Sequence, residues 1–315
     1  MYRPKVSIIV LSYNQRNTIG RALDSILRQR CSFPYEIIIG DDASTDGTRA
    51  ICEEYAARYS DIIRLMPAAP NKGVVDNYFD CLLECRGQYI SDCAGDDEWG
   101  DIDRMQRQTE YLDAHPEEVA VMSDWIIIRD GTCRNSGVSE IYNRLHNCVS
   151  SQDRLKVVLG KPGVFPFLSA MIYCRDTLLK FYHSNPQNIR RCEWGCEDLP
   201  VICALASLGR FGYVPLIASV YYQAVGSITN SKDKYGIFDF ALKSTAVRLS
   251  LCKIYNIDLQ EVSGGLSRVI RYSIGLAFKL HELEATRRLF KCLDGVSLKL
   301  PLVSRIKLFL LRFYM

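Results

Sequence analysis

The chain has 315 residues, 48% of them hydrophobic and 24% charged, a composition typical of a globular protein with material for one large domain or two modest ones. The chain contains 39 Lys and Arg and 36 Asp and Glu. From residue 236 onward there are 13 basic and 6 acidic residues, so the basic excess is confined to that end and the rest of the chain is slightly acidic. An acidic body argues against a nucleic-acid binder, and no apolar run approaches the roughly 20 residues that span a bilayer.

The 13 cysteines do not indicate a secreted disulfide scaffold. Their number is odd, the chain is long, and "MYRPKVSIIVLSYNQ" leads into a strand pattern without a signal peptide. No C-x-x-C pair is present to begin a structural zinc site. We therefore expect free, buried thiols in a reducing, cytoplasmic environment.

Strand and helix patterns alternate four times along the first part of the chain. Apolar runs rich in β-branched residues predict buried strands, and apolar residues at helical spacing predict the helices between them. The predicted strands are 5–14, 35–44, 62–67 and 88–95, and the predicted helices are 17–29, 45–59 and 74–87, with Asn17 as a helix N-cap and Gly87 as a helix stop. This order predicts an α/β fold with a mostly parallel sheet, which binds ligands beyond the carboxyl ends of its strands.

The second part of the chain is less regular. Strands are predicted at 119–128 and 167–175, a helix at 197–210, and a closing pair of strands at 211–223. Residues 130–150 show no pattern, and the polar stretch 225–234 is expected to be mobile. Everything after that stretch is expected to be helical.

The sequence lacks the familiar nucleotide-binding motifs and contains two acidic turns. No G-x-G-x-x-G follows the first strand, no Walker A sequence occurs, and "LSYNQRN" replaces the glycine-rich turn of sugar nucleotidyltransferases. Instead, Asp41–Asp42 and Asp96–Asp97 each follow a predicted strand, at the edge where a ligand would bind. Such acids suit a metal, a ribose or a proton, or belong to a solvated turn.

Four motifs in order resemble the family 2 glycosyltransferases, the inverting enzymes of the GT-A fold, along roughly residues 4–225. They are "VSIIVLSYNQ", "EIIIGDDASTDGT", "NKGVVDNY" leading into "GQYISDCAGDDEW", and "WGCEDLP". The resemblance implies a catalytic domain over 1–225, with a nucleotide half at about 1–100 and an acceptor half at about 101–225, and a helical region over 226–315. It also implies transfer of a sugar from a nucleotide-diphosphate donor, preferably a UDP-sugar, to a hydroxyl of a glycan or lipid-linked acceptor.

The resemblance assigns roles to the acids of the two turns. Asp96 is expected to contact the ribose, and Asp97 a Mn²⁺ or Mg²⁺ ion that neutralises charge on the leaving diphosphate. Asp42 is expected to accept a hydrogen bond from the base, typically uracil, while Asp41 supports the turn. Asp46 is expected to cap the helix that follows.

The pair Glu197–Asp198 matches the family's Glu-Asp pair, whose Asp is the catalytic base. Inversion requires a base that removes the proton of the acceptor hydroxyl as its oxygen attacks the anomeric carbon. A carboxylate at a helix N-terminus is stabilised as the anion and is ready to accept that proton. We therefore expect Asp198 to be the base and Glu197 to support it or cap the helix.

Other residues complete the expected site, with alternatives open. Tyr13 either stacks on the base or is a core residue. Asn71 and Lys72 line the nucleotide pocket, and the Lys72 ammonium either reaches the diphosphate or is solvated. Trp99 and Trp194 flank the two acid motifs and either pack on sugar rings or belong to the core.

One departure and one rival interpretation stand beside this prediction. Gln223 and Val225 replace the Arg and His with which the family closes over the diphosphate, so the closing contacts are in doubt.

The rival is a non-catalytic nucleotide-sugar-binding or assembly subunit, in which some of Asp42, Asp97 and Asp198 should be missing. All three are present, which favours an enzyme, and analogy suggests bacterial surface-polysaccharide assembly.

The basic end of the chain suggests a membrane partner. Residues 296–315 are apolar with interspersed Lys299, Arg305, Lys307 and Arg312. Long basic side chains snorkel to lipid headgroups while apolar neighbours enter the interface, which would hold the protein on the inner face of the cell membrane. The alternative is that these helices pack on the catalytic domain or form a homodimer contact.

Overall fold

A computed structural model of the protein describes residues 3–160, 166–223 and 233–314. The chain divides into two compact units: residues 1–151 and 166–222 form unit 1, and residues 152–165 and 223–315 form unit 2. None of the 13 cysteines, which all lie within the described ranges, forms a disulfide. None of the helices within the described ranges is both long and apolar enough to cross a membrane. Val225 and most of the stretch expected to be mobile lie outside the described residues.

Unit 1 is built on a sheet with the strand order β3-β2-β1-β4-β8-β6-β9-β5, to which β7 adds by pairing with β6. The strands are β1 (Val6–Ser12), β2 (Tyr35–Asp41), β3 (Ile63–Leu65), β4 (Tyr89–Ala94), β5 (Glu98–Trp99), β6 (Glu118–Arg129), β7 (Thr132–Asn135), β8 (Met171–Cys174) and β9 (Arg210–Tyr222). The first four strands of this order are parallel, as the sequence predicts. Beyond β4 the sheet is mixed, since β8 runs antiparallel to both β4 and β6.

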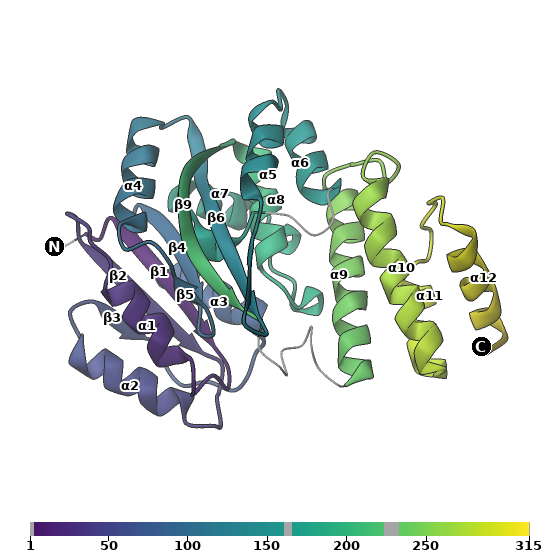
Figure 1. Ribbon diagram of the computed structural model, residues 1–315, viewed down its shortest axis with the longest axis horizontal. Coiled ribbons are helices and arrows are strands. Elements are labelled where there is room, and N and C mark those ends of the chain that lie inside the picture. The colour runs from purple at the N-terminus through teal and green to yellow at the C-terminus, as the bar shows by residue number, and fades with distance from the viewer. Residues whose placement is uncertain (1–2, 161–165, 224–232, 315) are drawn as a thin grey trace. The chain divides into compact units, whose positions relative to one another are not determined.

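Helices pack on both faces of this sheet (Figure 1). They are α1 (Ile19–Leu27), α2 (Thr48–Arg58), α3 (Val74–Glu84), α4 (Arg104–Ala114), α5 (Val138–His146), α7 (Arg175–Ser184) and α8 (Asp198–Leu208), with short 3₁₀ turns η1 (Leu168–Ala170), η2 (Pro186–Asn188) and η3 (Cys192–Trp194). The apolar residues of α1 at helical spacing, Ile19, Ala22, Leu23 and Ile26, are buried, as predicted.

The direction in which the chain crosses the sheet reverses after β3, and this reversal positions the site. The chain steps outward from β1 through β2 to β3 and then returns to β4 on the other side of β1. Right-handed crossovers therefore place α1 and α2 on one face and α3 on the other. A ligand crevice is expected outside the carboxyl ends of β1 and β4, where the strand order reverses.

Two local predictions about helix ends are wrong. The N-cap of α1 is Thr18, not Asn17, and it makes no side-chain cap hydrogen bond. The helix α3 ends at Glu84, so Gly87 does not stop it. A Cβ atom at Gly87 would lie 2.5 Å from the backbone nitrogen of Ser7, so the close approach of the chain to β1 is what requires glycine.

The sequence also misses whole elements. Residues 130–150 contain β7 and α5, and residues 211–223 form one strand instead of a pair. All four residues of β7 are exposed, so no alternating pattern marks it. The helix α4 escapes notice because its buried face includes the polar residues Arg104, Gln108 and Thr109.

A fully buried arginine connects the two halves of the sheet. The side chain of Arg104 is 0% exposed, and its guanidinium lies 4.0 Å from the ring centre of Trp99. Burial lowers the pKa of Arg104 to about 9. The guanidinium donates only to neutral acceptors: the carbonyls of Ser169 (2.6 Å), Ala218 (3.1 Å) and Met171 (3.3 Å), the hydroxyl of Ser91 (3.1 Å) and Oε1 of Gln108 (3.2 Å). One side chain thereby joins α4, β4, η1, β8 and β9.

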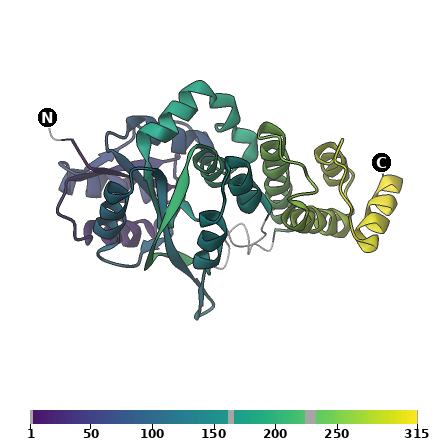
Figure 2. The same ribbon diagram turned by 90° about the horizontal axis from the view of Figure 1, so that it is seen from above.

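Unit 2 is helical, as the sequence predicts for the chain from residue 234 onward. It contains α9 (Lys234–Ile254), α10 (Ser263–Leu280), α11 (Leu283–Cys292), α12 (Leu302–Leu311) and the turn η5 (Arg312–Tyr314), together with most of α6 (Ser151–Gly160). The carboxylate of Asp233 caps α9 by accepting from the backbone nitrogens of Tyr235 and Gly236. The hydroxyls of Thr245 and Ser273 join α9 to α10 at 3.0 Å. Figure 2 shows these helices, green to yellow, from a second direction.

We predict that Arg104→Lys lowers the free energy of unfolding of unit 1 by about 2–4 kcal/mol, because an ammonium cannot serve acceptors spread over five elements and leaves buried carbonyls unpaired. Arg107→Lys is the matched control, since Arg107 lies on the same helix, is 45% exposed and makes one ion pair of 3.6 Å with Asp101. Urea unfolding followed by tryptophan fluorescence measures unit 1, which holds all 3 tryptophans. Equal stability of the two variants would contradict the role assigned to Arg104.

Candidate active site

The loops after β1 and β2 are tied together by side chains. The Asn14 side-chain oxygen accepts from the backbone nitrogen of Thr45 at 2.8 Å, and the Asn14 nitrogen donates to the Ser44 hydroxyl at 2.9 Å. Asn14 adopts a left-handed conformation, with φ of 53°, that turns the chain after β1. Its neighbour Tyr13 is 51% exposed, so Tyr13 is not a core residue and its ring is accessible to a ligand.

The first acidic turn supports its own loop and the loop before α3. Asp41 accepts from the hydroxyl and the nitrogen of Ser44, as expected of a residue that supports the turn. The two carboxylate oxygens of Asp42 accept from the backbone nitrogens of Lys72 and Gly73, both at 2.9 Å, and the Asn71 amide donates to the Asp42 carbonyl at 2.9 Å. Asp42 is nearly buried, so only its unused lone pairs remain for a base.

Asp46 serves the start of α2, although the N-cap residue is Gly47. Its carboxylate accepts from the nitrogen and the hydroxyl of Thr48, the first residue of the helix, at 2.9 and 2.6 Å, and from the nitrogen of Arg16 at 3.0 Å. The hydrogen bond from the Thr48 hydroxyl is the main cause that lowers the pKa of Asp46. Asp46 is therefore occupied by the loop and by α2.

Lys72 is paired within the protein, so its ammonium is not simply solvated. Its ammonium lies 2.6 Å from Oδ2 of Asp80 on α3. Asp80 also accepts from Arg190 at 2.9 Å, and Arg190 donates to Asp76 at 2.6 Å. The thiol of Cys192 donates to the same Asp76 carboxylate at 2.8 Å. The loop 71–73 is thereby connected, through α3, to the segment that precedes Glu197.

The second acidic turn contains a buried carboxylate without a partner. Asp97 is 1% exposed, and neither of its carboxylate oxygens has a hydrogen-bond partner among the described residues. Burial, followed by the charge of Asp96, raises the pKa of Asp97 well above its ordinary value, while the charge of Arg21 and contacts with the Tyr222 backbone and the Ser169 side chain, too poorly aligned or too long to be hydrogen bonds, oppose the shift. Burial also raises the pKa of Asp96. An unpaired buried carboxylate is costly, so a cation from outside the chain would stabilise this turn.

Within the described ranges, no group of three or more His, Cys, Asp or Glu side chains could hold a metal ion. A metal at this turn would therefore take few ligands from the protein. Mg²⁺ and Mn²⁺ fit that description, because they commonly bind through one or two carboxylates and complete their coordination with phosphate oxygens and water. The two free oxygens of Asp97 suit such a metal.

Arg21 is a site residue that the sequence does not reveal. Its guanidinium lies 3.8 Å from the ring centre of Tyr222, donates to the Asp96 carbonyl at 2.8 Å, and lies 3.7 Å from Glu98. Arg21 lies on α1, far from either acid motif in sequence, so no local pattern could connect them. The positive charge of Arg21 therefore lies beside the second acidic turn and close to Tyr222, the last residue of β9.

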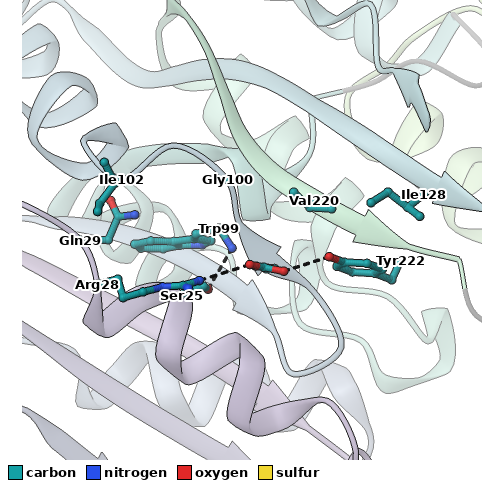
Figure 3. A pocket seen from close by; sticks show the side chains of 10 residues that line it. Ser25, Arg28, Gln29, Trp99, Gly100, Ile102, Ile128, Val220 and Tyr222 are labelled. Carbon is teal, nitrogen blue, oxygen red and sulfur yellow. Dashed lines mark hydrogen bonds and ion pairs between the residues drawn. The ribbon is translucent and has the colours of Figure 1, made fainter. Parts of the chain in front are cut away.

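A pocket of about 390 Å³ adjoins β5, the strand that follows the acidic turn. Glu98 lies in it between Arg28, at 3.2 Å, and the Tyr222 hydroxyl, at 2.9 Å (Figure 3). Its lining residues come from α1, β5, β6, β9 and the segment after β5: Ser25, Arg28, Gln29, Glu98, Trp99, Gly100, Ile102, Ile128, Val220 and Tyr222.

Both tryptophans that flank the acid motifs are core residues, which was one of the two expected alternatives. Trp99 and Trp194 are each 2% exposed. The Trp99 ring nitrogen donates to the Asp92 carbonyl at 3.1 Å, and Arg104 covers one face of the ring. The Arg191 guanidinium lies 5.2 Å from the Trp194 ring centre. Neither ring has a free face for a sugar.

The acids Glu197 and Asp198 lie at the N-terminus of α8. Glu197 occupies the N-cap position without making a side-chain cap hydrogen bond, and Asp198 is the first helical residue. Oδ1 of Asp198 accepts from the nitrogen of Leu199 at 2.6 Å. Burial, followed by the charge of Asp198, raises the pKa of Glu197 to about 8. The two carboxyls therefore differ in environment, with Glu197 favoured in the protonated form at neutral pH.

A buried polar network surrounds Asp92, which lies in β4 before the second acidic turn. The Tyr173 hydroxyl donates to Oδ2 of Asp92 at 2.8 Å, and the hydroxyls of Tyr78 and Tyr173 lie 2.6 Å apart. Burial raises the pKa of Asp92 to about 7, and the charge of Asp92 contributes to the raised pKa of Glu197. The sequence analysis missed Asp92, although a charged residue inside the otherwise uncharged strand "YISDCA" is a signal for it.

Residues 7–175 match the model of glycosyl transferase family 2, which covers more than half of the chain. The chain belongs to glycosyl transferase family 2. The match includes both acidic turns and Asp92, and it ends before Glu197–Asp198.

Several bacterial proteins are similar to part of the chain. The uncharacterized protein Mb1547 of Mycobacterium bovis is 43% identical over 131 residues, which are 42% of this chain and 38% of that protein. The putative glycosyltransferase EpsE of Bacillus subtilis is 40% identical over 112 residues, 36% of this chain and 40% of that protein. The putative teichuronic acid biosynthesis glycosyltransferase TuaG of Bacillus subtilis is 32% identical over 132 residues, 42% of this chain and 51% of that protein. The chain therefore matches about half or less of the length of these relatives.

Solved structures confirm the GT-A fold. The mannosyltransferase PcManGT of Pyrobaculum calidifontis, in complex with GDP-Man and Mn²⁺, has a TM-score of 0.55 at 19% identity and is matched over 100% of this chain and 86% of its own. Residues 1–349 of S. aureus TarS, in complex with UDP-GlcNAc, have a TM-score of 0.55 at 16% identity, over 98% of this chain and 89% of that one. The α/β fold and the family predicted from the four motifs are both correct.

We predict that Asp92 makes this family 2 member less stable as pH rises. The folded-state pKa of Asp92 is raised from 3.8 to about 7, so its contribution to stability is complete below pH 4 and is lost as pH rises towards 7. Asp92→Asn keeps a neutral, hydrogen-bonding group and should remove that loss. Between pH 5 and 7 the variant should gain about 2 kcal/mol relative to the wild type, at 1.4 kcal/mol per pH unit, in urea unfolding. Parallel pH profiles of the two proteins would contradict the prediction.

Proposed function

We propose that the protein is a glycosyltransferase that moves a sugar from a nucleotide-diphosphate donor to an acceptor hydroxyl with inversion, in the synthesis of a cell-surface polysaccharide. The observation that carries the proposal is the unpartnered, buried carboxylate of Asp97 at the carboxyl end of β4 in a family 2 fold. Relatives named for glycosyl transfer and for teichuronic acid biosynthesis support the reaction class and the process.

The nucleoside end of the donor is proposed to lie at the loops after β1 and β2. Tyr13 offers an accessible ring for stacking on the base, and Asp42 and Asn71 organise the adjoining loop. A UDP-sugar is favoured because the N–H of uracil suits the remaining acceptor capacity of Asp42. Similar folds are known with UDP-GlcNAc and with GDP-Man, so the base is a point to be tested.

The diphosphate end is proposed to lie at Asp96 and Asp97, with Asp96 near the ribose. Asp97 would hold Mn²⁺ or Mg²⁺, which neutralises the charge that develops on the leaving diphosphate. Arg21, which lies beside this turn on the Asp96 carbonyl, adds fixed positive charge. Lys72 is excluded from this role in the proposal, because Asp80 holds its ammonium at 2.6 Å.

Asp198 is proposed to be the base that accepts the proton of the acceptor hydroxyl. It lies in the first turn of α8, where the helix dipole favours the anion. Glu197 is less suited, because burial and the charge of Asp198 raise its pKa and so favour its protonated form. In that state Glu197 relieves Asp198 of a neighbouring negative charge. The rival function, a non-catalytic nucleotide-sugar-binding subunit, would not require this difference between the two carboxyls.

A donor screen separates these functions. The protein is incubated with Mn²⁺ and several UDP- and GDP-sugars, and release of the free nucleotide is measured. Metal-dependent release from one donor supports the enzyme, and binding without release supports the rival.

We predict that Asp97→Asn lowers nucleotide release by about 10²–10³-fold, the equivalent of the several kcal/mol that a bound metal supplies to the transition state. The metal-free variant should be at least as stable as the wild type, because the substitution removes a buried, unpaired charge. The nucleotide-release assay measures the first effect, urea unfolding measures the second, and calorimetry with Mn²⁺ and UDP measures metal binding. Asp61→Asn, at an exposed position, is the control. Undiminished Mn²⁺ binding in Asp97→Asn would refute the metal assignment.

We predict that Asp198→Asn lowers kcat by about 10²–10⁴-fold and leaves the affinity for the donor nearly unchanged, because a base acts in the transition state. Glu197→Gln should cost much less, since the amide resembles the protonated acid that Glu197 already favours. Steady-state kinetics with the donor found in the screen distinguish the two. A larger loss of kcat in Glu197→Gln than in Asp198→Asn would reverse the assignment.

A further inference from the structure

The helix α12, yellow in Figures 1 and 2, carries an apolar stripe that no described residue covers. Six large apolar side chains of this segment are between 41% and 74% exposed. They are Leu302, Val303, Ile306, Phe309, Leu310 and Phe313. Their spacing of three, four and seven residues places them on one face of a helix. So large a continuous apolar face marks an interaction surface.

The opposite face of α12 packs within unit 2. Ser304 and Leu311, seven residues apart, are buried. The Lys307 ammonium lies 5.5 Å from the ring centre of Phe278 on α10. On a helix Lys307 lies nearly opposite Arg305, so the sequence alone does not separate a basic face from an apolar face. The structure removes this difficulty, since Lys307 belongs to the packed face.

The charge around the stripe has one sign. Residues 295–315 contain four bases and no Asp or Glu. Lys299, Arg305 and Arg312 are exposed. A second copy of the chain, docked through a twofold axis, would bring like charges together at its edge, whereas anionic headgroups would complement them. The charge therefore favours lipid over self-association.

We propose that the exposed face of α12 binds an anionic lipid surface. The apolar stripe enters the boundary between headgroups and acyl chains, and Lys299, Arg305 and Arg312 contact lipid phosphates. At 10 residues, α12 is about 15 Å long and lies in the interface instead of crossing it. Three bases and one short apolar face give a reversible attachment.

Flotation of the full chain with vesicles tests the proposal. The protein should float with phosphatidylcholine vesicles that contain phosphatidylglycerol, less with pure phosphatidylcholine, and less at high salt. The double variant Ile306→Ser/Phe309→Ser should bind at least about tenfold more weakly, because it removes two large apolar groups from the interface. Arg305→Gln should weaken binding about fivefold, the effect of one base near an anionic surface. Phe240→Ser, at a 41% exposed position on α9, should bind like the wild type.

Three results would overturn the proposal. One is absence of flotation at low salt, and another is equal flotation of the double variant and the wild type. The third is a concentration-dependent dimer in sedimentation that the double variant abolishes, without flotation of either protein, which would make the stripe a contact between copies. None of these measurements uses sugar transfer, so their failure leaves the proposed function standing.

Discussion

The contact of the Arg104 guanidinium with four strand and turn segments is the interaction on which unit 1 depends. The parallel strands β3-β2-β1-β4 provide the Rossmann-like half, and β8, β6, β9 and β5 provide the mixed half. Only β4 and β8 pair across the boundary, over three residues. Arg104 reinforces that short connection with hydrogen bonds to both sides, and its stacking on Trp99 holds the strand that follows the second acidic turn.

Because Arg104 gives its hydrogen bonds to neutral acceptors, it neutralises none of the acids around it by direct contact. Asp92, Asp97 and Glu197 are all held in surroundings that raise their pKa values, by burial first and by neighbouring acids in the cases of Asp97 and Glu197. Such an arrangement lowers stability, so its presence in β4, in the turn after β4 and at the start of α8 is consistent with a site that a cation and a charged donor complete. The same acids would be anomalous in a protein that served only as a scaffold.

The sequence predicts the parts of the fold in which local pattern and burial agree. The strands β1, β2 and β4 are continuous apolar runs, and the acidic turns after β2 and β4 follow directly, so the fold class and the position of both turns could be predicted. The contacts of Asp42, by contrast, depend on the loop before α3, some 30 residues away in sequence. Arg21, Arg104 and Asp92 act across the sheet and leave no periodic signal, and the burial of Trp99 and Trp194 depends on arginines that cover their rings. Pairwise contacts of this kind are specified by tertiary packing, not by local propensity.

The helix α3 connects the two ends of the candidate site. At its N-terminus the loop 71–73 binds Asp42, and its Asp76 and Asp80 hold Arg190 by hydrogen bonds of 2.6 and 2.9 Å. Arg190 is the residue that brings the segment before Glu197 onto this helix. The Asp80 carboxylate also pairs with Lys72 at 2.6 Å, so the loop that binds Asp42 and the segment that carries Arg190 meet at the same side chain of α3. In the proposed function, recognition of the donor and placement of the base therefore depend on the same helix.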